Sequence, residues 1–372
     1  MENKITFLVR LQIYKVALIY IIILGTPVTG QNFITNPGRG PLITPNTIPV
    51  SLQFMTFTAE DAFTRPARSW HIALHYAQTS IFAKSSDIID NLPDSRARLS
   101  LTKDLLVQTA VNGVEDHGYL FDTEINHINL RIVYGFSARI ALQFQLPLIG
   151  YSGGFMDEPI EHFHRSFNLF NSNREKLARD DVVILLSDRQ NLQYRNMAQL
   201  GGVCIGDMAI SVKSQLWHDA AAGFALAGRL GIKLPTGDPA RWRGSGSTDL
   251  GLDILASKIL GDFILSTNLG VIKPGKWRKF PVIELQPAYS WLVGLEYQWD
   301  SHVSLLAQNT IAASVLKGNV HPALSLTAFT WTVGGKIDIW HKTMLALGVT
   351  QNYINHENTI DFGFQVGLET SL

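Results

Sequence analysis

The sequence has little cysteine, little charge and, after its N-terminus, no long apolar run. Of its 372 residues one is cysteine and 17% are charged, with 31 basic and 31 acidic side chains. The single Cys204 excludes a disulfide framework and a cysteine-based zinc site. The balanced charge argues against a nucleic-acid-binding protein. A bundle of membrane-spanning helices is also excluded, because each such helix needs roughly 18 consecutive apolar residues.

The remaining composition is apolar for a chain with so few charges. Hydrophobic residues make up 46% of the sequence and aromatic residues 10%, with 30 glycines and a mean hydropathy of +0.10. This combination, without a long apolar run, is typical of a transmembrane β-barrel.

The first 30 residues have the three parts of an export signal. A basic region is followed by an apolar core at residues 16–24 and by small or polar residues at 25–30. The basic residues are Lys4, Arg10 and Lys15. We expect a cleavable signal peptide at residues 1–30, with an uncleaved anchor helix as the alternative. Residues 31–68 are then a periplasmic or plug segment or an extra strand, and residues 69–372 form the barrel.

From residue 119 onward, apolar and polar residues alternate with the period of two of a β-strand. In residues 139–148, for example, one face is wholly apolar. Short turns and longer polar connections also alternate along the chain, as in an up-and-down antiparallel barrel with periplasmic turns and outer loops. The pattern predicts twelve strands near residues 70–83, 119–135, 138–149, 203–217, 221–235, 248–259, 263–272, 283–299, 302–313, 323–340, 343–352 and 359–372.

Three further stretches have a strand-like composition. Residues 50–57, 99–111 and 182–186 fit strand extensions, loop hairpins or part of a plug, so ten or fourteen strands are the alternatives to twelve. Five aromatic residues fall at the predicted periplasmic ends, where an aromatic girdle is expected. These residues are Trp70, Tyr134, Trp217, Trp299 and Trp340. Trp217 and Trp340, however, fall on the inward phase of their strands.

If the apolar face contacts lipid, the opposite phase places charges of both signs inside the barrel. The basic residues are Arg131, Arg139, Lys213, Arg229, Lys233 and Lys336, and the acidic residues are Asp249, Asp253, Glu296, Asp338 and Glu369. A strand register that places Arg229 opposite Asp253 also places Lys233 opposite Asp249. We therefore predict two cross-strand ion pairs in a narrow lumen, with simple solvation of the interior as the alternative.

Residues 153–167 predict a short helix in the first long outer loop, beginning near Pro159. Met156, Ile160, Phe163 and Phe167 form its apolar face. Asp157, Glu161 and His164 form the opposite face, with His162 to one side. We expect this helix to lie in or over the mouth as a lid with a solvated polar face. One Glu-x-x-His pair without a second such helix is a weak metal signal, so no metal and no cofactor is expected.

Nucleophilic catalysis needs a serine beside a histidine. No Ser–His spacing stands out among the eleven histidines. We therefore expect that the chain is not an enzyme, and an outer-membrane hydrolase is the third hypothesis.

Two motifs carry a family resemblance. The first is Gly153-Gly-Phe-Met-Asp157 with Ile160-Glu-x-Phe-His164-x-x-Phe167, preceded by Tyr134-Gly135 and followed by Arg174. The second is Lys233-Leu-Pro-Thr-Gly-Asp238 with Gly244-Ser-Gly-Ser247. From about residue 40 onward the sequence resembles a family of uncharacterised Gram-negative outer-membrane barrels with a domain of unknown function. The second motif also resembles barrels proposed to move aromatic compounds. The resemblance implies the fold and compartment, but no catalytic residues.

The sequence therefore predicts an all-β outer-membrane barrel of a Gram-negative bacterium, with a passive channel for small solutes as the favoured function. A closed barrel with a structural or surface-recognition role is the alternative. The expected partners are outer-membrane lipid and lipopolysaccharide and, during insertion, the barrel-assembly machinery.

Overall fold

The computed structural model describes residues 39–85, 98–105, 118–168, 173–187, 192–318, 321–340, 342–355 and 358–372. The predicted signal peptide and the start of the segment that follows it lie outside these residues, as do residues 106–111. No helix in the described ranges is long and apolar enough to cross a membrane.

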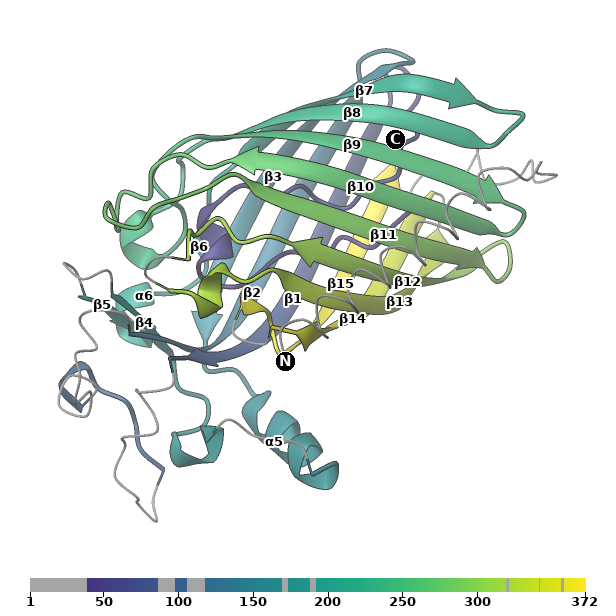
Figure 1. Ribbon diagram of the computed structural model, residues 1–372. Helices are drawn as coiled ribbons and strands as arrows, with labels where there is room; N and C mark the ends of the chain where they lie inside the picture. The colour runs from purple at the N-terminus through teal and green to yellow at the C-terminus, as the bar shows by residue number, and fades with distance from the viewer. Residues whose placement is uncertain are drawn as a thin grey trace, which may run out of the picture.

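A single antiparallel sheet closes into a ring (Figure 1). In the described part of the chain, twelve strands pair with their neighbours around the ring, and the first pairs with the last. They are β1 (Trp70–Lys84), β2 (Tyr119–Gly135), β3 (Ile140–Ser152), β7 (Ala209–Asp219), β8 (Phe224–Lys233), β9 (Asp249–Leu260), β10 (Phe263–Lys273), β11 (Ala288–Gln298), β12 (Val303–Ala312), β13 (Ala328–Trp340), β14 (Thr343–Ile354) and β15 (Phe362–Ser371). The predicted twelve-stranded barrel is confirmed.

Alternation along each strand separates an apolar outside from a polar inside. In β9, Leu250, Leu252 and Ile254 are 45–55% exposed, whereas Asp249 and Asp253 are buried. Short turns join the strands at one end of the barrel, which we call the turn end, and longer connections join them at the other, the loop end. The inward residues meet no lipid, so strand phase alone determines which charges line the lumen.

Two tryptophans depart from the predicted phase because of β-bulges. The register shifts between Gln215 and Trp217 in β7, and between Asp338 and Trp340 in β13. One extra residue reverses the side to which the following side chain points. Trp217 is 61% and Trp340 73% exposed, so the placement of these two residues on the inward phase was wrong.

The smaller elements lie at the loop end. They are β4 (Val183–Ser187), β5 (Leu192–Asn196), β6 (Cys204–Ile205), helix α5 (Asp157–Ser166), helix α6 (Met197–Leu200) and the 3₁₀ turns at Ser51–Gln53, Arg174–Lys176, Pro239–Arg241 and Ala323–Ser325. β4 pairs with β2 at residues 119–122 and so extends the sheet beyond the ring. The strand-like residues 182–186 thus belong to an extension of the sheet.

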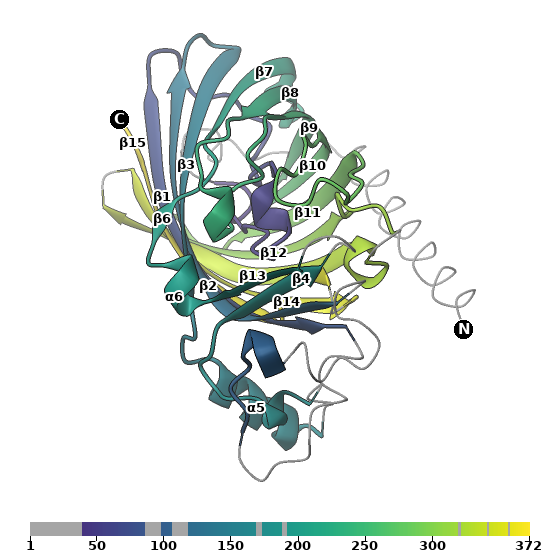
Figure 2. The ribbon, with the colours of Figure 1, turned by 90° about the vertical axis from the view of Figure 1, so that its left-hand side faces the viewer.

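Residues 39–68, which we call the plug, run through the lumen and back (Figure 2). The chain enters at the turn end, where Arg39 contacts Glu296. It reaches the loop end at Gln53, which donates to the Trp242 carbonyl oxygen at 2.9 Å. It returns to the turn end, where the Thr64 hydroxyl donates to the Ala138 carbonyl oxygen at 2.9 Å. These residues form no strand, so the plug is separate from the sheet.

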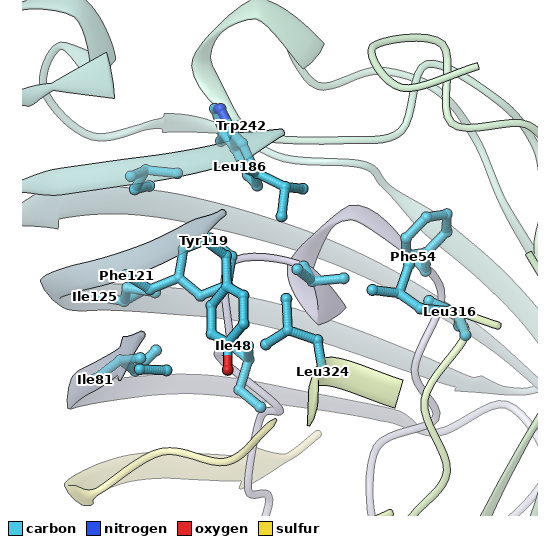
Figure 3. Close-up of a cluster of buried hydrophobic side chains, with 14 of the residues drawn as sticks. Ile48, Phe54, Ile81, Tyr119, Phe121, Ile125, Leu186, Trp242, Leu316 and Leu324 are labelled. Carbon is cyan, nitrogen blue, oxygen red and sulfur yellow. The ribbon is translucent and has the colours of Figure 1, made fainter. Parts of the chain in front are cut away.

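An apolar cluster closes the loop end around the tip of the plug (Figure 3). Ile48 and Phe54 of the plug pack there against inward side chains of β2 and against connections that fold into the mouth. The connections contribute Trp242, Trp277, Phe280, Leu316 and Leu324. Burial of this cluster removes apolar surface from water and stabilises the plug in place.

Candidate functional site: the plugged lumen

Strand register brings together the four lumen residues predicted from the sequence. β8 and β9 align Arg229 with Asp253 and Lys233 with Asp249. Arg229 forms an ion pair with Asp253, and Lys233 Nζ lies 3.2 Å from Asp249 Oδ2. All four side chains are buried inside the barrel, where a charge without a partner is costly.

Glu60 of the plug lies among three basic side chains of the wall. Its Oε1 is 2.9 Å from Lys213 Nζ, and its Oε2 is 3.0 Å from Arg229 Nη1 and 3.5 Å from Arg131 Nη1. Opposite charges and hydrogen bonds of this kind stabilise a carboxylate inside the barrel. Glu60 therefore joins the plug to β2, β7 and β8.

At the turn end the signs of charge are exchanged, because the basic Arg39 of the plug contacts acidic side chains of the wall. Its guanidinium lies 3.3 Å from Glu296 Oε1 and 3.5 Å from Asp338 Oδ2. The Gly40 N–H donates to Glu296 Oε2 at 2.6 Å. The plug thus presents an acid to a basic part of the wall and a base to an acidic part, which fixes its position along the barrel. Arg139 is exposed in a turn and takes no part in this pairing.

Two glycines of the wall make room for the plug. Gly231 of β8 and Gly251 of β9 lie opposite each other in the register. A Cβ at Gly231 would lie 2.3 Å from Met55, and one at Gly251 would lie 2.7 Å from Phe57. A larger residue at either position would therefore require the Met55 or Phe57 side chain of the plug to shift.

Lys233 connects the plug to the inward-folded connection between β8 and β9. It donates to the Gln53 carbonyl oxygen at 2.8 Å and to Ser245 Oγ at 2.9 Å, and it forms an ion pair with Asp207. In the same connection, the fully buried Arg243 donates to the Ile149 carbonyl oxygen at 3.0 Å. These connections, together with the apolar cluster, cover the loop end.

Helix α5 does not cover the mouth. It lies outside the ring of strands, beside the loop end (Figures 1 and 2). The face that it buries also differs from the expectation. Asp157 and Glu161 are buried beside Met156 and Ile160, whereas Phe163 and Phe167 are 45% and 65% exposed. The placement of this loop as a lid was therefore wrong. His162 is exposed and His164 half-buried on the same helix.

The burial of Asp157 and Glu161 has an electrostatic cause. Glu161 Oε1 lies 2.7 Å from Arg98 Nη1, and its Oε2 lies 2.8 Å from Arg179 Nη2. Burial by itself would raise the pKa of Glu161, but these hydrogen bonds and charges outweigh it and lower the pKa. Asp157 accepts from the Asp180 N–H at 2.8 Å. The charged face of α5 therefore docks against the protein, and the aromatic face points away.

Two glycines let α5 approach the wall. A Cβ at Gly153 would lie 1.7 Å from the Asp180 carbonyl oxygen. Gly154 has φ +68° and packs against the Glu124 carboxylate, a conformation and a contact that favour glycine. The Gly-Gly pair at 153–154 thus has a structural role.

Cavities remain around the plug, and two of them differ greatly in size. One of about 80 Å³ lies beside residues 43–46 and 51–58, against β1, β2 and β3. The other, of about 440 Å³, opens at the turn end and is lined by residues that include Arg39, Phe63, His71 and Gln215. Among the described residues, no group of three or more histidine, cysteine, aspartate or glutamate side chains is arranged to hold a metal ion.

A hydrolase needs a serine hydroxyl beside a histidine ring. At the loop end, Ser166 Oγ lies 3.5 Å from His162 Nδ1, but its hydroxyl donates to the His162 carbonyl oxygen at 2.8 Å. At the turn end, His71 Nδ1 lies 3.0 Å from Ser371 Oγ and its Nε2 lies 3.3 Å from Glu369 Oε2. The second contact lies inside the barrel, at the end opposite the outer loops.

Sequence reasoning missed Arg39, Glu60 and Arg243. A signal for Glu60 exists, because Glu60 and Asp61 are the only charged residues between positions 40 and 64. When a segment with few charges precedes a barrel with inward basic residues, a carboxylate in that segment indicates a contact between the segment and the barrel wall. Arg243 has no comparable signal, since its partners are backbone carbonyl groups.

The closed ring, its apolar outer face and its polar interior define an outer-membrane β-barrel. The chain belongs to the family described as "Protein of unknown function (DUF3187)", whose model matches residues 18–371. No curated protein matches the sequence.

Two of the solved structures that the chain resembles are outer-membrane transport proteins, and the first of them shows the same fold. The COG4313 outer membrane channel from Pseudomonas putida F1 is 12% identical with a TM-score of 0.52, and the match covers 84% of this chain and 98% of that one. The Pseudomonas putida toluene transporter TodX is 10% identical with a TM-score of 0.36, and the match covers 94% of this chain and 98% of that one.

Proposed function

We propose that this protein is a passive channel for small solutes in the outer membrane of a Gram-negative bacterium, and that residues 39–68 close it in the conformation described. The proposal rests on one observation, which is that the plug forms no strand and is separate from the sheet. The plug crosses the lumen without joining the sheet, so its displacement opens a passage without breaking a strand ladder.

The lumen wall supports a water-filled passage. Its inward side chains are charged or polar along β7, β8 and β9, with Lys213, Arg229 and Asp253 as examples. A barrel that serves only as a scaffold can fill its interior with apolar side chains, whereas this wall suits water once the plug has moved. The mixed signs of charge favour weak ion selectivity.

The size and lining of one cavity favour a small molecule as the solute. The cavity of about 440 Å³ at the turn end lies within the range of small-molecule sites, and its lining combines polar and aromatic side chains. The COG4313 protein is named as an outer membrane channel, which agrees with this proposal through the shared fold.

A reversible cross-link tests the plug as a gate. Thr47 Oγ1 of the plug lies 2.7 Å from Thr79 Oγ1 of β1, close enough for a disulfide after substitution of both by cysteine. Thr47→Cys with Thr79→Cys, in a Cys204→Ser background, is to be measured by single-channel conductance in a planar bilayer. We expect conductance after reduction and its loss after oxidation.

Two variants complete this experiment. Glu60→Gln loosens the plug and is expected to lengthen open events, whereas Asp61→Asn, whose carboxylate contacts Arg65 within the plug, is the matched control. Deletion of residues 155–168 is expected to leave conductance unchanged, because α5 lies outside the ring. Conductance that persists in the oxidised cross-linked protein would show that solutes bypass the plug and would overturn the gate.

The alternative is a closed barrel with a structural role. The apolar cluster at the loop end favours it, because Trp242, Trp277 and Phe280 seal the mouth independently of the charges. Absence of conductance from every variant, including the reduced cysteine pair and Glu60→Gln, would establish the closed barrel and reject the channel.

A further inference from the structure

Helix α5 and the residues that flank it present an aromatic surface that remains exposed in the described part of the chain. Phe155, Phe163 and Phe167, which we call the phenylalanine stripe, are 59%, 45% and 65% exposed. Phe163 and Phe167 are one helical turn apart, with ring centroids separated by 4.7 Å, and the exposed Pro159 lies one turn before them. Exposed aromatic side chains gathered on one face mark an interaction surface.

The docking of α5 fixes the direction of this stripe. The opposite face is held by Glu161 between Arg98 and Arg179, and by Asp157 against the Asp180 N–H. Rotation of the helix to bury the phenylalanines would break these contacts and expose a fully buried carboxylate. The outward direction of the stripe is therefore a stable feature of the fold.

The outer wall beside α5 changes from apolar to polar at the level where the helix is attached. Along the outward faces of β1 and β2, the register pairs Leu74 with Leu130 and then, toward the loop end, Gln78 with Asn126. Tyr76 lies between these levels and donates to Asn126 Oδ1 at 2.7 Å. An aromatic residue with a polar tip at such a transition marks the boundary between lipid and water.

Helix α5 is tied to this boundary by Glu124, the next outward residue of β2. Glu124 Oε1 accepts from the Phe155 N–H at 2.8 Å and also from the Met156 N–H. Both views of the ribbon show α5 outside the ring beside the loop end (Figures 1 and 2). The stripe thus continues outward from the lipid-facing wall at the height of the lipid headgroups.

The geometry points to α5 as an interfacial helix that lies on the outer leaflet, with the phenylalanine stripe among the acyl chains and Arg165 against anionic headgroup phosphates. Arg165 is exposed on the same helix, on the side opposite the phenylalanine stripe. A helix with an apolar stripe and a cationic opposite face binds such a boundary in this orientation. This inference rests on membrane insertion of the barrel and is independent of whether the barrel conducts.

Spin-label accessibility tests the proposal on the full chain. A nitroxide is attached to Phe163→Cys in a Cys204→Ser background, and the protein is inserted into vesicles of phosphatidylcholine with phosphatidylglycerol as the anionic component. The matched control carries the label at Glu158→Cys on the same helix, where the native side chain is 73% exposed. Collision rates are measured with oxygen, which concentrates in lipid, and with a water-soluble nickel complex.

We expect the oxygen-to-nickel collision ratio at position 163 to be several-fold higher than at position 158. Arg165→Gln is expected to lower the ratio at 163 in anionic vesicles and to leave it unchanged in pure phosphatidylcholine. Equal ratios at 163 and 158 would place the stripe in water and overturn the proposal. Protection of position 163 from both reagents, with spin–spin broadening, would instead show that a second copy of the chain covers the stripe.

Discussion

The plug and helix α5 are both held to the barrel by a buried glutamate between basic side chains, but on opposite sides of the wall. Inside, Glu60 is held by Lys213, Arg229 and Arg131, whose side chains are 1–3% exposed. Outside, Glu161 is held by two arginines, Arg98 and Arg179, whose side chains are 30% and 29% exposed. The partners of Glu60 have little access to water, and only Arg229 has a second carboxylate, Asp253, whereas the partners of Glu161 also reach water.

This difference determines what each contact does. A buried pair is expensive to break because the remaining charge has no solvent. A pair at the surface is replaced by water at a smaller cost. The inner contact therefore fixes one plugged state, and the outer contact orients a helix that can detach without opening the barrel.

The largest effect is expected for Glu60→Ala. The change leaves three buried cations without their shared carboxylate and lowers the free energy of unfolding by about 3–5 kcal/mol. Urea unfolding of the protein in vesicles, followed by tryptophan fluorescence, measures the loss. Asp61→Asn serves as the control, with an expected loss of about 1 kcal/mol. Equal losses for the two variants would contradict a special role for Glu60.

A smaller effect is expected for Glu161→Gln. It weakens charge-assisted hydrogen bonds to arginines that water can solvate, so the free energy of local opening of α5 falls by about 1.5–3 kcal/mol. Hydrogen exchange of residues 157–166 measures this opening. Exchange in β8 and β9 is expected to remain unchanged, and faster exchange there would show that α5 supports the barrel itself.

Acidification is expected to break the contacts of Glu161 at a higher pH than those of Glu60. The pKa of Glu161 is lowered in the folded protein, so its stabilisation is complete above the pKa of unfolded glutamate, about 4.3. It is lost as the pH falls through the lower, folded pKa. Glu60 is enclosed by three cations inside the barrel, and we expect its contact to persist to lower pH. Exchange measured from neutral pH downward should therefore show α5 opening before the plug, and the reverse order would refute this ranking.

The smallest effect on stability is expected for Phe163→Ala. Its ring is exposed and contacts mainly Phe167, so in detergent the free energy of unfolding changes by about 0.5 kcal/mol or less. The same urea titration measures it, with Phe121→Ala as the buried comparison. Phe121 is fully buried, and its loss is expected to cost about 3–5 kcal/mol. A large effect at Phe163 would mean that the stripe packs against protein.

Local patterns predicted most of the barrel. Each of the twelve strands overlaps a range that the alternation predicts. The strand register that aligns Arg229 with Asp253 also aligns Lys233 with Asp249, as predicted. The two misplaced tryptophans follow bulges, and a bulge so near the end of a strand leaves too few residues after it for the change of phase to be visible in the sequence. Helix α5 was predicted as a helix, but the burial of Asp157 and Glu161 on it was not.

The sequence by itself determined the strands, their lipid-facing side and the charges of the interior, because these depend on residues two apart or on neighbouring strands. Tertiary structure alone decided what fills the lumen and where α5 docks. Arg39 and Glu296 are 257 positions apart, and Glu60 and Arg229 are 169 apart. No local pattern encodes such partners, since they meet only after the ring has closed around the plug. The orientation of α5 depended likewise on Arg98 and Arg179, whose charges outweighed the preference of its phenylalanines for burial.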